Sequence, residues 1–155
     1  MPVAFQFTAL DPKDFPAIDN PQSASATSRW LIADQHPGFP CRVSLKDAQP
    51  GERVLAISYT HHPVASPYRA SGPVFIRQGA IQATPAVNEV PAFLHHRLLS
   101  VRAYDAAGMM ADACVVKGSE LKAVLQRLLR DDQVDYLHIH NAGPGCFMCG
   151  VGRVD

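Results

Sequence analysis

One stretch near the C-terminus has the spacing of an amphipathic helix, and this limits the folds that the chain can adopt. Its apolar side chains recur at intervals of three and four residues and form one stripe: Leu121, Val124, Leu125, Leu128 and Leu129. Ser119 precedes the stripe and belongs to a residue type that favours the N-cap position. Because this is the one clear helical pattern, we expect a single helix packed against strands.

The other apolar segments are short and rich in residues that favour strands. Residues 98–105 and 109–117 read as a hairpin, because glycine occupies position 108 in the turn between them. Further strands are expected at residues 3–10, 29–33, 53–59, 74–77, 136–140 and 147–154, and residues 60–73 are expected to form a long ordered loop. The predicted fold class is α+β, with a mainly antiparallel sheet of six to eight strands packed by one clear C-terminal helix, in a single domain of residues 1–155.

The charges of the chain balance, with 14 Lys and Arg residues and 14 Asp and Glu residues. A neutral chain that lacks an aromatic and basic platform is not typical of nucleic-acid-binding proteins. The sequence also lacks an apolar run of about 18 residues and an N-terminal signal pattern. We therefore expect a cytoplasmic protein that binds neither nucleic acid nor membranes, with its four cysteines reduced.

Residues 136–150 combine two histidines, a Gly-Pro-Gly turn and two cysteines. Strand side chains alternate between faces, so His138 and His140 share one face while Leu137 and Ile139 share the other. The apolar pair indicates the core face. The histidines are therefore expected to face water, a cleft or a partner.

The same segment supplies the residues of a candidate zinc site, because imidazole and thiol groups are the ligands that tetrahedral zinc prefers. The candidate ligands are His138, His140, Cys146 and Cys149. A structural interpretation remains open beside this one, since tight turns need glycine and proline and since cysteine often packs as a small apolar residue. The spacing from His140 to Cys146 is also not a standard zinc-finger spacing.

A second group of candidate residues lies in the loop of residues 67–73. Arg69 is suited to bind an anionic group, Ser71 to complete the contact and Tyr68 to stack on a ring. With Asn141, these three form the candidate ligand-binding residues, and a small anionic molecule is the expected ligand. The alternative is that Arg69 forms an ion pair that holds the loop in place.

Other charged residues have structural explanations. Arg42, Arg77 and Arg102 lie in or beside expected strands. If they lined one cleft they would indicate an acidic small molecule, but cross-strand ion pairs with Asp105 or Asp112 are the simpler arrangement. Two histidine doublets, at residues 61–62 and 95–96, add imidazole groups. Adjacent side chains diverge in an extended chain, so at most one histidine of each doublet is expected to join a site.

Several motifs together resemble a bacterial family, the domain of unknown function numbered 1203. They are Pro40-Cys41-Arg42, Pro67-Tyr68-Arg69-Ala70-Ser71-Gly72-Pro73, Arg102-Ala103-Tyr104-Asp105 with Gly108-Met109, and His138-Ile139-His140-Asn141-Ala142 with Gly145-Cys146-Phe147. The resemblance spans nearly the whole chain. It implies no particular activity, ligand or catalytic residue.

Two hypotheses about function follow. The first is a small-molecule or metal-binding domain, with or without catalytic activity, whose polar site combines the hairpin of residues 138–149 and the loop of residues 68–72. It predicts that the histidines, Cys146 and Arg69 converge. The second is a non-catalytic interaction or structural module, such as a homodimer, which predicts dispersed histidines, cysteines packed in the core, and an exposed apolar patch instead of a pocket.

Overall fold

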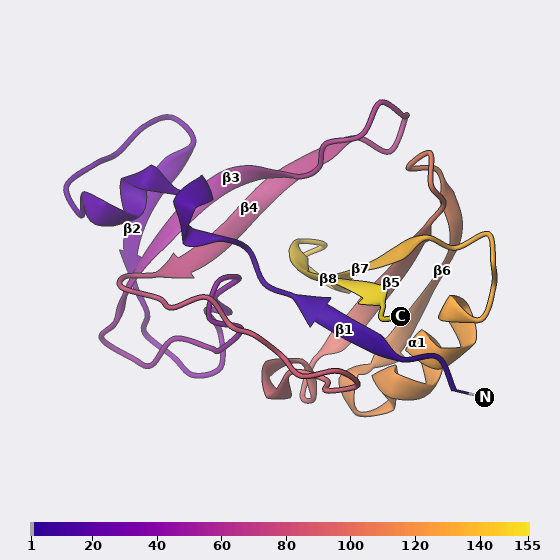
Figure 1. Cartoon of the computed structure of the whole chain (residues 1–155). Helices are drawn as coiled ribbons and strands as arrows, with labels where there is room; N and C mark the ends of the chain where they lie inside the picture. Colours follow the sequence, from indigo (N-terminus) through magenta and orange to yellow (C-terminus); the bar gives the residue numbers. More distant parts are fainter. Residues whose placement is uncertain (1) are drawn as a thin grey trace.

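The computed structural model describes residues 2–155 of the chain. Its elements, in order, are β1 (Phe5–Thr8), the 3₁₀ turns η1 (Pro12–Asp14) and η2 (Pro16–Asp19), β2 (Ser28–Ile32), β3 (Arg53–His62), β4 (Ala70–Arg77), η3 (Ala92–Leu94), β5 (Leu98–Tyr104), β6 (Met110–Lys117), η4 (Gly118–Glu120), α1 (Leu121–Leu129), β7 (Tyr136–Asn141) and β8 (Phe147–Arg153). The predicted α+β class, the antiparallel strand pairing, the number of strands and the single C-terminal helix are confirmed. The eight strands form two sheets rather than one (Figure 1).

The larger sheet has five strands in the order β1-β8-β7-β5-β6, and all neighbouring strands are antiparallel. Its core face packs against the apolar stripe of α1, which buries Leu121, Leu125, Leu128 and Leu129. Leu137 and Ile139 of β7 are fully buried in the same cluster. Burying a leucine or isoleucine side chain contributes about 1.5–3 kcal/mol, so this packing fixes which face of β7 points inward.

The helix begins differently from the prediction. Ser119 does not cap it; instead the 3₁₀ turn η4 leads into α1, and the N-cap residue Glu120 makes no side-chain cap hydrogen bond. Gly118 packs so closely on the chain at Leu94 that a Cβ atom there would lie 1.7 Å from the Leu94 carbonyl oxygen. This approach holds the entry to the helix in place without a side-chain cap.

The smaller sheet has the order β2-β3-β4, with β3 in the centre. Its apolar side chains Leu55, Val74 and Ile76 form a second cluster together with Phe15, Cys41 and Val43, which lie outside the sheet. Trp30 of β2 also packs against this cluster, and its indole N–H donates to the carbonyl oxygen of Asn20 at 3.0 Å. Each sheet therefore has an apolar cluster of its own.

The prediction of a long loop at residues 60–73 is wrong, because most of this segment belongs to a β-hairpin. β3 continues to His62 and β4 begins at Ala70, so residues 63–69 alone connect them. Pro73 is compatible with a strand here because β4 lies at an edge of the sheet, where a residue without an N–H group is tolerated.

The β3–β4 hairpin extends beyond the smaller sheet, and its tip reaches the turn between β5 and β6 (Figure 1). Ser66 Oγ donates to the carbonyl oxygen of Gly108 at 2.9 Å. Gly108 has a φ of 77°, and a Cβ atom there would lie 2.8 Å from Cβ of Val64. The glycine that sequence analysis assigned to the hairpin turn is thus also needed where the two hairpins meet.

Among the described residues, no helix is long and apolar enough to cross a membrane.

Candidate functional site

Four histidines gather where the β3–β4 hairpin lies over the five-stranded sheet. We call this group, His61, His62, His138 and His140, the histidine cluster. The ring centroids of His61 and His140 are 5.0 Å apart, those of His62 and His138 are 5.1 Å apart, and those of His61 and His138 are 6.2 Å apart. His140 is fully buried, and His138 and His62 are 9% and 1% exposed.

The two histidines of β7 lie on the face predicted from the alternation of the strand, opposite the apolar core. What covers this face is the hairpin, which contributes both His61 and His62. Both histidines of this doublet thus lie in the cluster, although adjacent side chains were expected to diverge. The register of β3 with β4 shifts between Tyr59 and His62, and such an irregularity interrupts the strict alternation of side chains.

Three tyrosines surround His62 and satisfy its ring. Its Nδ1 is 2.8 Å from the carbonyl oxygen of Tyr68, and its Nε2 is 2.6 Å from the hydroxyl oxygen of Tyr136. The Tyr104 ring lies against His62, with centroids 4.0 Å apart. His62 therefore acts as a structural bridge between the hairpin and β7.

The other three histidines are not satisfied in this way. Among the described residues, both ring nitrogens of His61, the Nδ1 atom of His138 and the Nε2 atom of His140 are buried and have no hydrogen-bond partner. The Nδ1 atom of His140 is 3.0 Å from the carbonyl oxygen of Gly145. A buried polar atom without a partner costs about 1–3 kcal/mol, so four of them in adjoining rings indicate a missing partner.

Electrostatics keep these rings neutral. The pKa of His138 is lowered to about 3, chiefly by burial and to a smaller extent by the neighbouring His62. Burial also lowers the pKa of His61 and of His140 to about 4, and Arg102 contributes in both cases. At neutral pH each ring therefore offers one N–H donor and one lone pair.

Arg102 of β5 lies directly across the strand pair from His138, and Ser100 lies across from His140. Side chains at paired positions of neighbouring strands share a face, with Cβ atoms about 4.5–5.5 Å apart. The predicted ion pair of Arg102 with Asp105 or Asp112 is not present. The Asp105 carboxylate accepts from backbone N–H groups of the β5–β6 turn, and Asp112 pairs with Arg127.

Arg42 is a second arginine of this region and is 1% exposed. Its Nε atom donates to the carbonyl oxygen of Phe147 at 2.7 Å, and Nη1 donates to that of Pro40 at 2.5 Å. Burial lowers the pKa of Arg42, and the Cys146 thiol opposes this shift. The positive charge of Arg42 in turn helps to lower the pKa of His140.

The four candidate zinc ligands are not brought together. Cys149 lies across from Ile139, is fully buried in the core cluster, and has its pKa raised by burial. Cys146 is half-buried beside Asn141, whose Nδ2 atom donates to its Sγ atom at 3.1 Å. Asn141 itself pairs with Leu99, on the core side of β7. Within residues 2–155 no group of three or more His, Cys, Asp or Glu side chains is placed to hold a metal ion.

The candidate ligand-binding residues of the loop are also separated from one another. The carbonyl oxygen of Tyr68 contacts His62 of the histidine cluster. The centroid of the Tyr68 ring lies 6.3 Å from that of the Tyr104 ring. Arg69 is exposed and takes part in no ion pair of the described chain. The Ser71 hydroxyl is hydrogen-bonded to that of Thr60 at the surface.

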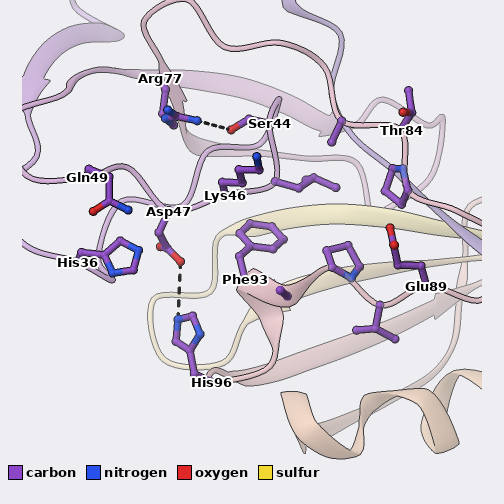
Figure 2. A pocket seen from close by; sticks show the side chains of 16 residues that line it. His36, Ser44, Lys46, Asp47, Gln49, Arg77, Thr84, Glu89, Phe93 and His96 are labelled. Carbon is purple, nitrogen blue, oxygen red and sulfur yellow. Dashed lines mark hydrogen bonds and ion pairs between the residues drawn. The ribbon is translucent and has the colours of Figure 1, made fainter.

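Sequence analysis missed a groove of about 740 Å³ between the segment of residues 44–49 and the segment of residues 83–96 (Figure 2). In it the Asp47 carboxylate, 3% exposed, accepts hydrogen bonds from both Nη atoms of Arg97, at 2.9 Å for Nη1. His96 Nε2 lies 3.7 Å from Asp47, so His96 belongs to this groove and not to the histidine cluster. Because the positive charge of Arg97 neutralises the Asp47 carboxylate, this ion pair is a structural contact that requires no ligand.

The fold and site together define an α+β protein in which two antiparallel sheets enclose a cluster of neutral histidines flanked by arginines. The chain belongs to the family of proteins of unknown function DUF1203, whose model matches residues 38–153. This range contains β3 to β8 and all of the histidine cluster, with Arg42 and Arg102. No match was found among curated proteins or among solved structures.

Proposed function

We propose that the protein is a small-molecule-binding domain whose ligand contacts the histidine cluster. The observation that carries this proposal is the set of four buried ring nitrogens, on His61, His138 and His140, that lack a hydrogen-bond partner in the described chain. Native proteins rarely leave such atoms unpaired, and a ligand or ordered water is the usual partner.

The position of the cluster also favours binding over a purely structural role. It lies between two sheets, at the end of a hairpin that is attached to the larger sheet by few polar contacts, among them His62 with Tyr136 and Ser66 with Gly108. Residues 60–69 of this hairpin belong to no apolar cluster, so a polar ligand can contact the histidines without entering the apolar core.

Zinc is the second candidate ligand, and one observation favours it. His140 is held through Nδ1 by the Gly145 carbonyl oxygen, which leaves the lone pair of Nε2 free, and metal-binding histidines are commonly oriented in this way. With His61 and His138 it would supply three neutral imidazoles. The side chains would have to rotate, since no three of them are placed for a metal within residues 2–155.

The interaction-module hypothesis predicted dispersed histidines and core cysteines; the gathered histidines support ligand binding, whereas the buried Cys149 agrees with the interaction module. Arg69, which the binding hypothesis expected in the same pocket, is exposed. A homodimer is compatible with either function and stays a prediction. We assign no catalytic step to the site.

The test is to identify what the protein carries after purification without an affinity tag. Elemental mass spectrometry would measure metals, and mass spectrometry of the denatured sample would measure small molecules released from the protein. Wild type would be compared with His140→Phe, which removes one unpartnered nitrogen, and with His95→Ala as the matched control, because His95 lies outside the cluster.

A small molecule bound to wild type and His95→Ala, and lost in His140→Phe, is the expected result. About one zinc per chain in wild type and His95→Ala, lost in His140→Phe, would instead support zinc as the ligand. If wild type carries neither, and neither zinc nor a panel of small polar molecules raises its melting temperature, the proposal is wrong.

A further inference from the structure

The chemistry around the histidine cluster also indicates what kind of molecule it binds, and this step depends on the proposed function. Two arginines flank the cluster, and neither has a carboxylate partner in the described chain. The ion pairs of residues 2–155 are Arg77–Glu52, His96–Asp47, Arg97–Asp47 and Arg127–Asp112. Arg42 and Arg102 therefore leave an uncompensated positive charge beside neutral rings.

Of the two arginines, Arg102 is the one that a ligand can reach. Arg42 is 1% exposed and its guanidinium is engaged by two carbonyl oxygens. Arg102 is half-buried, and its Nε atom makes only a long hydrogen bond to Ser100 Oγ at 3.5 Å. Arg102 also contacts the Tyr104 hydroxyl, where it opposes the rise that burial causes in the pKa of Tyr104. A guanidinium with unused N–H groups binds carboxylate and phosphate in two-pronged fashion. Arg42 adds a fixed positive charge behind His140.

The ring nitrogens add a second requirement. Because Nδ1 of His140 faces a carbonyl oxygen, it must carry the proton of the neutral ring, and the buried Nε2 atom then offers a lone pair. A lone pair accepts a hydrogen bond, so its partner must be a donor. An anion that only accepts hydrogen bonds would leave this nitrogen unsatisfied, whereas an O–H group would satisfy it.

His61 is compatible with the same ligand. Both of its ring nitrogens are unpartnered, so it offers one donor and one acceptor. The His61 ring stacks on Phe147, with centroids 5.2 Å apart and planes 12° apart, which fixes it beside His140. A group with both an acceptor oxygen and an O–H is complementary to this pair.

The open side of the site lies over β5 and β6. Leu98, Ser100 and Arg102 alternate along β5 on the face that carries the histidines, and Val115 lies across from Ser100. Leu98 and Val115 are 55% and 64% exposed. The approach to Arg102 is therefore apolar and uncovered, which suits the hydrocarbon part of an organic acid.

We infer that the ligand is an organic oxyanion with an O–H group beside the charge, either a 2-hydroxycarboxylate or a phosphate monoester in its monoanionic form. The anionic oxygens bind Arg102 at the entrance, and the O–H group donates to Nε2 of His140. The hydrocarbon part lies along Leu98 and Val115. Carboxylate and phosphate share this chemistry, and the probes below separate them.

The test is calorimetric titration of the intact protein at pH 7 with 2-hydroxyhexanoate, hexanoate and inorganic phosphate, each at matched chloride concentration. The expected order places 2-hydroxyhexanoate or phosphate well ahead of hexanoate. Arg102→Gln should raise the Kd of the preferred probe by about tenfold or more, because the charge-assisted hydrogen bonds to the anion are lost. The matched control is Arg127→Gln, an exposed arginine on the other face of the sheet.

Amide NMR shifts of the wild-type protein locate the bound probe without relying on a variant that could fail to fold. Shifts confined to β5, β7 and the end of β3 are expected. Hexanoate binding as tightly as the better of 2-hydroxyhexanoate and phosphate would overturn the O–H requirement. Binding unchanged in a folded Arg102→Gln, or shifts located elsewhere, would overturn the site.

The two proposals fail in different ways. If zinc or an uncharged molecule binds at the histidine cluster while all three oxyanion probes bind no better than chloride, the ligand class is wrong and the proposed site stands. If nothing binds at the cluster, both are wrong.

Discussion

His62 and Tyr136 are joined by a hydrogen bond of 2.6 Å although they belong to different sheets and lie 74 residues apart in sequence. The other ring nitrogen of His62 faces the carbonyl oxygen of Tyr68, so one imidazole links the end of β3, the connecting loop and the start of β7. His62 is 1% exposed, and water cannot readily replace either partner. This ring thus fixes the hairpin over the remaining histidines.

Replacing Tyr136 with phenylalanine should therefore destabilise the protein. The substitution keeps the ring but leaves Nε2 of His62 buried without a partner, at a cost of about 1–3 kcal/mol. Urea unfolding would measure the change. Tyr68→Phe is the control, because the Tyr68 contact to His62 uses its backbone carbonyl and its side chain is 38% exposed. Equal effects of the two substitutions would contradict the assignment.

Stability should depend on pH through the buried histidines. In the native state the pKa of His138 is about 3 and that of His140 about 4, against an ordinary value of 6.5. At pH values between the native-state pKa and 6.5, these histidines bind protons in the unfolded chain but not in the native state. The free energy of unfolding is therefore highest above pH 6.5 and falls as the pH drops towards 4, at a rate that approaches about 1.4 kcal/mol per pH unit for each histidine.

Urea unfolding at pH 7 and pH 5 would test this dependence. A folded His140→Phe variant should lose less stability than wild type between the two pH values, since one of the protonating groups is gone. His95→Ala should resemble wild type, because His95 is exposed. A wild-type protein that is equally stable at both pH values would refute the prediction.

Gly118→Ala should destabilise the start of α1. The added Cβ atom would lie 1.7 Å from the Leu94 carbonyl oxygen and 2.7 Å from the Leu94 carbonyl carbon, which are backbone atoms that cannot rotate away. We expect a loss of about 1–3 kcal/mol in thermal or urea unfolding. The control is Gly143→Ala, where nothing lies within 4 Å of the new atom. A Gly118→Ala protein as stable as the Gly143→Ala control would contradict the close packing of Gly118 on the Leu94 carbonyl group.

Asp47→Asn should be the most costly of the single substitutions in the groove of Figure 2. Arg97 is 12% exposed, and removal of its partner charge leaves a largely buried guanidinium unpaired, which typically costs about 3–5 kcal/mol. The comparison is Asp112→Asn, whose contact with Arg127 is 3.7 Å long and half exposed, and which should change stability by less than about 1 kcal/mol. Similar losses in both variants would contradict a structural role for Asp47.

Sequence alone predicted the elements whose patterns are local. The alternation of β7 placed Leu137 and Ile139 in the core and the two histidines on the other face, because a two-residue period is fixed by strand geometry. The stripe of α1 and the glycine of the β5–β6 turn were predicted for similar reasons, since a helix face and a left-handed turn residue depend on near neighbours. Ser119 was the exception, because a tertiary contact at Gly118 replaced the cap.

The site depends on contacts between residues distant in sequence, which explains what sequence reasoning missed. His61 and His62 lie in a segment rich in turn-forming residues, and a strand there becomes favourable only through pairing with β4. The absence of acidic partners for Arg42 and Arg102 depends on the arrangement of every carboxylate in three dimensions. The two cysteines looked paired in sequence, yet one faces the core and the other lies beside Asn141.

Because two of the cysteines are buried, the rates at which they react with a thiol reagent report how the two sheets open. Cys41 and Cys149 are both fully buried, the first in the apolar cluster of the smaller sheet and the second in that of the larger sheet. A thiol reagent can reach them only when the surrounding cluster opens, so each labelling rate records one sheet. Equal rates would mean that the sheets unfold as one cooperative unit, and unequal rates would mean that one sheet can come apart while the other persists.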